Sequence, residues 1–145
     1  MIYITDEPEG ETYKALLKFA MARCHAFSLV WRYKMRPKPA NDEILAALSP
    51  FLISERDTNK WPGTKLHGKA TVRHYKFTHE VLPVLFRVDG LYSWLHPKCP
   101  EDLALYLPNG DNWLASVAHE RLSWLTDTKL TIEELCQAVP NLQAR

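Results

Sequence analysis

Hydrophobic residues recur at helical spacing through the first third of the chain. The positions are Tyr13, Leu16, Leu17, Ala20, Cys24, Phe27 and Trp31. Intervals of three and four residues place such side chains on one face of a helix. The pattern therefore predicts one long helix from about Glu11 to about Tyr33. A short strand over residues 2–5, where the side chains alternate, would precede it.

Prolines and polar residues divide the segment that follows. Pro37 and Pro39 cannot continue a helix, because proline lacks the amide hydrogen and clashes with the preceding turn. Asn41 would cap a second helix. The buried side of that helix would consist of Ile44, Leu45, Leu48, Phe51 and Leu52. Residues 54–68 are polar and rich in turn formers, so we expect a mobile loop with its sharpest turn at residues 61–63.

The next elements are predicted from residue type and from capping. Residues 69–77 are β-branched and aromatic, which favours a strand, and a helix would begin after Thr78. Near the end of the chain, Thr131 and Glu134 have the spacing of a capping box. They predict a short terminal helix.

A hairpin is predicted between residues 103–107 and 113–118. Both runs are rich in apolar residues, and Pro108-Asn109-Gly110-Asp111 stands between them. Asn-Gly supplies the positive φ angles that a tight hairpin needs. We therefore expect an α+β fold: a single domain over residues 1–145, with the long N-terminal helix packed on a small antiparallel sheet that includes the C-terminal hairpin.

Composition favours a cytoplasmic, self-sufficient domain. The 145 residues are 46% hydrophobic, enough for a sizeable core, and the 24% charged fraction is that of an ordered protein. Asp6 and Glu7 stand where a secretory signal needs basic residues. No uncharged apolar run approaches the roughly 20 residues of a membrane helix. Cys24, Cys99 and Cys136 lie far apart, as expected of reduced thiols.

Charge is unevenly distributed along the chain. The net charge is +1, which argues against a dedicated nucleic-acid binder. Residues 1–76 carry 13 Lys/Arg against 8 Asp/Glu, a net of +5, and residues 77–145 carry 5 against 9, a net of −4. Such an asymmetry would orient a charged partner.

Recognisable metal and cofactor motifs are missing from the sequence. His79-Glu80 and His119-Glu120 begin like the zinc motif HExxH, but Pro83 and Ser123 stand where its second histidine belongs. Only five glycines are present, and none of the phosphate-binding glycine patterns occurs. We therefore expect no metal, no cofactor and no enzymatic activity.

Two alternatives remain open at this point. One is a small enzyme in which His119 acts with Glu120 or Asp102 as acid and base. The other is nucleic-acid binding through residues 65–76, where basic and aromatic residues are mixed. The residues concerned are Lys65, Lys69, Arg73, His74, Tyr75 and Lys76.

The segment from Leu91 to Leu125 contains the pattern hP..PEDL.fy...G..WL.S.aHE. Its matched positions are His96, Pro97, Pro100, Glu101, Asp102, Leu103, Tyr106, Gly110, Trp113, Leu114, Ser116, His119 and Glu120. This segment resembles the C-terminal half of small uncharacterised bacterial proteins that are similar to immunity proteins, which protect a cell against a protein toxin. The resemblance implies a binding protein that occludes a cognate toxin.

The contact residues of such a protein would lie mainly in the acidic half of the chain. Glu101, Asp102, Asp111 and Glu120 are the candidates for charge contacts, which speed association and set its register. Trp61 stands in a Pro-Gly turn within a polar segment, so we expect it to be exposed and to anchor the interface.

Overall fold

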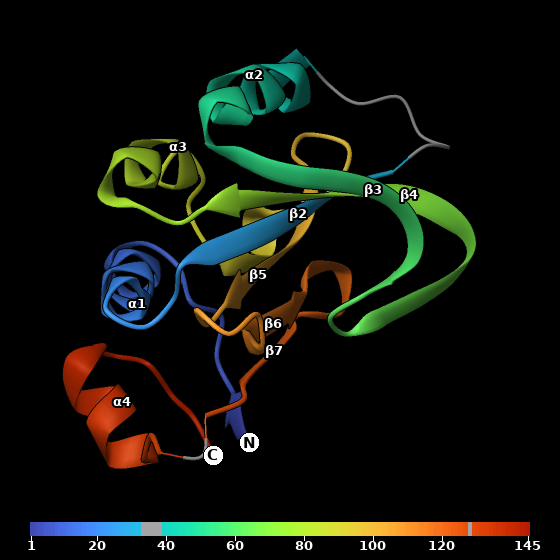
Figure 1. The fold of residues 1–145 in the computed structure, drawn as a ribbon. Coiled ribbons are helices and arrows are strands. Elements are labelled where there is room, and N and C mark those ends of the chain that lie inside the picture. Colours follow the sequence, from blue (N-terminus) through green and yellow to red (C-terminus); the bar gives the residue numbers. More distant parts are fainter. Residues whose placement is uncertain (33–38, 128) are drawn as a thin grey trace.

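Seven antiparallel strands form one sheet in the part of the chain that the computed structural model describes, residues 1–32, 39–127 and 129–145 (Figure 1). Their order across the sheet is β1-β7-β6-β5-β2-β4-β3. The strands are β1 (Ile2–Ile4), β2 (Ala26–Arg32), β3 (Leu52–Trp61), β4 (Thr64–Lys76), β5 (Glu101–Tyr106), β6 (Asn112–Val117) and β7 (Leu122–Leu125). The α+β class is confirmed.

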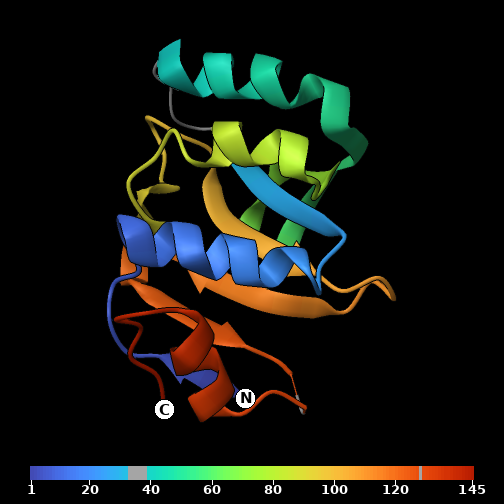
Figure 2. The same ribbon diagram turned by 90° about the vertical axis from the view of Figure 1, so that its left-hand side faces the viewer.

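The helices lie on one side of this sheet. They are α1 (Glu11–Met21), α2 (Pro39–Leu48), α3 (Leu82–Leu85) and α4 (Ile132–Ala138). Figure 2 shows α2, α3, α1 and α4 one below another, with the strands behind them. None of the helices in the described residues is long and apolar enough to cross a membrane.

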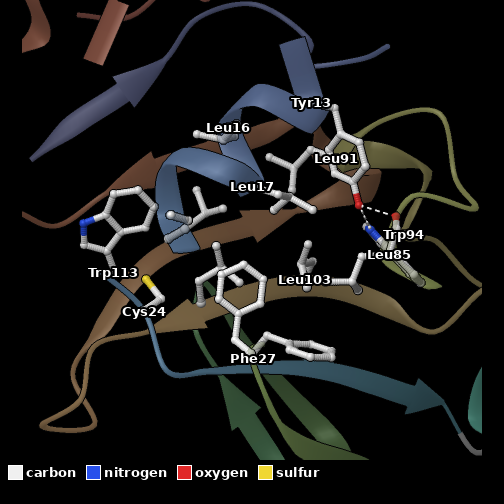
Figure 3. Packing of buried hydrophobic residues seen from close by; sticks show 14 of the residues in the cluster. Tyr13, Leu16, Leu17, Cys24, Phe27, Leu85, Leu91, Trp94, Leu103 and Trp113 are labelled. Atoms are coloured by element: carbon white, nitrogen blue, oxygen red, sulfur yellow. Dashed lines mark hydrogen bonds between the residues drawn. The ribbon is translucent and has the colours of Figure 1, made fainter. Parts of the chain in front are cut away.

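The main core fills the space between the helices and the sheet (Figure 3). Leu16 and Leu17 on α1 are fully buried, as are Phe27 on β2 and Trp113 on β6. Tyr13 adds a polar contact at the edge of this core, because its hydroxyl donates to the Leu85 carbonyl at 2.7 Å and accepts from Trp94 Nε1 at 2.9 Å. The Tyr13 hydroxyl is therefore satisfied within the largely apolar core.

The prediction of a long N-terminal helix is wrong. α1 ends at Met21, and residues 26–32 form β2, which pairs with β4 on one side and β5 on the other. Residues 27–30 are all buried, because helices cover one face of β2 and the β3–β4 hairpin covers the other. A strand buried on both faces lacks the alternation of polar and apolar residues, so it is easily taken for part of a helix.

The prediction of a mobile loop over residues 54–68 is also wrong. These residues belong to β3 and β4, which form a hairpin whose turn lies at Pro62-Gly63, as expected. Cross-strand pairs join the two strands: Arg73 Nε donates to Glu55 at 2.8 Å, and Thr71 donates to Asp57 at 3.0 Å. A strand with largely solvated side chains shows no apolar pattern, which is why composition suggested a loop.

The more local predictions hold better. The opening strand, the helix after Thr78 and the β5–β6 hairpin are confirmed. The capping box of Thr131 and Glu134 is present at the start of α4. Asn41, however, lies inside α2 with its side chain buried, and Leu52 is 41% exposed.

Removing the hydroxyl of Tyr13 tests the polar contact in the core. Tyr13→Phe leaves the Trp94 indole N–H and the Leu85 carbonyl without a partner in a buried place. We expect the free energy of unfolding to fall by about 1–3 kcal/mol, measured by urea denaturation. Tyr3→Phe is the control, since Tyr3 is 48% exposed, and an equal loss in both variants would contradict the assignment.

Candidate binding cleft

The β3–β4 hairpin curls across the face of the sheet that the helices leave open. In the described residues β2 pairs with β4 from Ala26 to Arg32, opposite Lys76 to Ala70, and the outer part of the hairpin lies between Ala70 and the turn. Figure 1 shows that part bending round until its tip lies beside β6 and β7. The hairpin thus forms a curved wall opposite the sheet.

Trp61 and Asp102 fasten the tip of this hairpin to the sheet. Trp61 Nε1 donates to Asp102 Oδ2 at 2.9 Å, and Asp102 Oδ1 accepts from the backbone N–H of Ala118 at 2.9 Å. Both side chains are buried. Burial raises the pKa of Asp102, and the two hydrogen bonds oppose that shift. We call this pair the tip latch.

Charged neighbours stand beside the tip latch. The Arg32 guanidinium lies 5.6 Å from the centre of the Trp61 ring, and its Nη1 is 3.7 Å from Glu101 Oε2. Burial raises the pKa of Glu101, whereas Arg32 lowers it. Glu101 and Asp102, which begin β5, therefore make their contacts with other groups of the same chain.

Gly63 brings the turn of the hairpin into direct contact with the sheet. A Cβ atom at this position would lie 2.7 Å from Val117 Cγ2 and 2.9 Å from Trp124 Cη2, and φ is +86°. Only glycine satisfies both the backbone angle and the close approach. Packing at Gly63 supplements the tip latch.

A cleft of about 580 Å³ lies between the curled hairpin and the open face of the sheet. His74 on β4 and Tyr106 on β5 contribute to it from the sheet, with their ring centres 5.0 Å apart. Arg56 and Lys60 contribute from β3, and His25 from the segment before β2. The volume is typical of pockets that hold a small molecule or a few side chains.

The side chains around this cleft are basic or neutral. No carboxylate lines it within the described part of the chain. Glu55 and Asp57 alternate with Arg56 along β3, and their contacts are with Arg73 and Thr71 on the far side of the hairpin. The cleft therefore carries uncompensated positive charge.

Burial shifts the pKa values of His74 and Tyr106, two aromatic groups that line the cleft from the sheet. Burial lowers the pKa of His74, and the Arg56 charge lowers it further. His74 is consequently neutral at pH 7. Burial raises the pKa of Tyr106, whose hydroxyl shares a 2.8 Å hydrogen bond with Ser28 Oγ. The fixed positive charges at the cleft are those of Arg56 and Lys60.

The expected acidic contact surface is not assembled. Trp61 is only 6% exposed, which corrects the expectation of an exposed anchor. Glu101 and Asp102 are 6% and 1% exposed, so they do not present charge to a partner. Asp111 and Glu120 are exposed but stand before and after β6, at opposite ends of that strand. The four carboxylates therefore do not share one face.

The proposed acid–base residues His119 and Glu120 lie close together, outside the cleft. His119 and Glu120 belong to one turn of 3-10 helix (Ala118–Glu120), with His119 Nε2 3.7 Å from Glu120 Oε1 and both side chains 55% exposed. Asp102 is occupied by the indole and the Ala118 amide. Neither His119 nor Glu120 lines the cleft.

The basic and aromatic residues of 65–76 are distributed over both faces of β4. Tyr75 is buried against Phe27, and Arg73 is paired with Glu55. His74 faces the cleft, whereas Lys69 lies among the residues of the other face. Of the six basic and aromatic residues named for this segment, His74 alone lines the cleft, while Lys65, Lys69 and Arg73 fall on the opposite face of β4.

Sequence reasoning missed Arg56, Lys60 and Tyr106. A signal for Arg56 was present, because charge signs alternate over Glu55, Arg56 and Asp57, as they do when a strand exposes two different faces. No group of His, Cys, Asp or Glu side chains among the described residues is arranged to hold a metal ion.

Comparisons with protein-family models, with curated proteins and with solved structures find no match.

A pair of glycine variants tests the contact at the hairpin tip. Gly63→Ala meets both an unfavourable φ, worth about 1–2 kcal/mol, and a clash with Val117 and Trp124 worth about 1–3 kcal/mol more. Gly110→Ala meets only the unfavourable φ, since nothing lies within 4 Å of its added Cβ. Urea unfolding should rank Gly63→Ala as clearly less stable, and equal stabilities would show that the tip is not packed on β6 and β7.

The electrostatic coupling at the cleft is testable by NMR. Arg56→Gln removes a positive charge near His74, so the pKa of His74 should rise while staying below its ordinary value, because burial is the larger cause of the shift. A pH titration of the ring protons measures it. Lys69→Gln should leave the value unchanged, and an unchanged pKa in Arg56→Gln would contradict the placement of Arg56.

Proposed function

We propose that this chain is a binding protein of the immunity type, which neutralises a cognate protein toxin by direct contact and catalyses no reaction itself. The contact surface is the cleft and the curled hairpin around it. The observation that carries the proposal is that Arg56 and Lys60 line this cleft, and that no carboxylate of the described residues lines it with them. A fixed charge without an internal partner is suited to a partner on another molecule.

The hairpin is also held in a defined position, which favours its use as a binding surface. The tip latch and the packing of Gly63 hold its far end, so the wall of the cleft is positioned before a partner arrives. Preorganisation of this kind lowers the entropy lost on association.

The segment that resembles immunity proteins contributes directly to this architecture. Asp102 forms the tip latch, Tyr106 lines the cleft and Gly110 stands at its rim. Ser116 fastens β6 to β5, since its hydroxyl donates to the Leu103 carbonyl at 2.7 Å. We therefore infer that these positions of the pattern serve to build the binding surface.

Co-expression provides the test. The candidate toxin is the product of the reading frame next to the gene, produced in a bacterial host with and without this chain. We expect that product alone to arrest growth, and the chain to restore growth and to co-elute with it in gel filtration. A neighbour that is harmless, or one that is toxic but neither bound nor neutralised, contradicts the proposal.

Charge reversal locates the contact. Arg56→Glu combined with Lys60→Glu should abolish both rescue and co-elution. Lys69→Glu makes the same kind of change on the other face of the hairpin and should leave both intact. If the two variants behave alike, the cleft is not the contact surface.

A further inference from the structure

The charge at the cleft suggests what it receives, given the proposed function of binding a protein. Arg56 and Lys60 both line the cleft from β3, four residues apart in the sequence. Two cations at this spacing match a chain segment with more than one negative group better than a single small ion. The planar guanidinium of Arg56 favours a carboxylate, which it can bind through two parallel hydrogen bonds.

Apolar groups beside these cations suggest the neighbouring residues of such a segment. Ile53 on β3 is 53% exposed and lines the cleft together with Leu107. An exposed isoleucine next to an arginine gives the cleft an apolar and a charged part. A segment in which acidic and aliphatic residues alternate would satisfy both parts.

The surrounding charges limit the length of the occupant. Glu55 and Asp57 are exposed on the outer face of the hairpin, and exposed Asp111 follows Gly110 at the rim. A nucleic acid that continued past Gly110 would meet the Asp111 carboxylate, whereas nucleic-acid binders carry a continuous basic stripe. The two fixed cations of the cleft, Arg56 and Lys60, both lie on β3, which favours a short segment.

We propose that the cleft between the β3–β4 hairpin and the sheet binds a short acidic segment of a partner protein, with its carboxylates at Arg56 and Lys60 and an aliphatic side chain against Ile53.

Defined probes test this inference. The purified chain is titrated into fluorescein-labelled peptides in which several glutamates alternate with leucines, and binding is followed by fluorescence anisotropy. A matched peptide with glutamine for glutamate and an oligothymidine of the same charge are the comparisons. We expect the glutamate peptide to bind, the glutamine peptide to bind at least about tenfold more weakly, and added salt to weaken the complex.

Neutralising variants assign the contact. Arg56→Gln and Lys60→Gln should each lower the affinity for the glutamate peptide several-fold, while Lys69→Gln should not change it. Urea unfolding of each variant shows whether the fold is retained. If one of the two cleft variants does not fold, the peptide affinity of the other variant still tests the inference.

Several results would overturn the inference. The first three are equal affinity for the two peptides, tighter binding of the oligothymidine, and no binding of the glutamate peptide. The fourth is a loss of peptide affinity in Lys69→Gln as large as that in Arg56→Gln and Lys60→Gln. The outcome is separable from that of the proposed function. If the chain restores growth but does not bind the glutamate peptide, the inference of an acidic segment is wrong and the toxin role stands. If the chain binds the peptide but does not restore growth, the toxin role is wrong and the inference of an acidic segment stands.

Discussion

The hydrogen bond from the Trp61 indole to Asp102 determines the shape of the open face of this protein. An isolated hairpin is at best marginally stable, and none of the described strands pairs with the outer part of β3–β4 apart from the two strands themselves. A buried carboxylate is costly unless hydrogen bonds satisfy it. Asp102 receives two, from Trp61 and from the Ala118 amide. The same carboxylate therefore restrains the hairpin and terminates β6, and the width of the cleft depends on it.

This interaction also explains why charge along the sequence differs from charge on the surface. The C-terminal half is acidic, yet Glu101 and Asp102 face inward, where Arg32 and the indole stabilise them. On β3 the opposite happens, because Arg56 and Lys60 face a space without counter-charges. A segment with a small net charge thus presents a positive concavity, while the two carboxylates that begin β5 present little of their charge to a partner.

What could be predicted from sequence depended on the range of the interactions involved. The capping box of Thr131 and the β5–β6 hairpin are local, so their residues carried the information. β2 was missed because its burial comes from α1 and from the hairpin, elements that lie far away in sequence. Trp61 and Asp102 were both singled out as surface contacts, but they are 41 residues apart and bind each other. No local sequence pattern predicts a hydrogen bond between two residues so far apart in the chain.

The two edge strands of the sheet, β1 and β3, differ in how they are protected. Along β1, Tyr3 exchanges backbone hydrogen bonds with Arg145, which covers that border. Along β3, the outermost strand, no further strand of the described residues is added. Long, flat outer strands invite edge-to-edge aggregation, and natural sheets avoid it by twisting or charging such strands. β3 is both curved and charged, so the bend that creates the cleft also discourages other chains from extending the sheet.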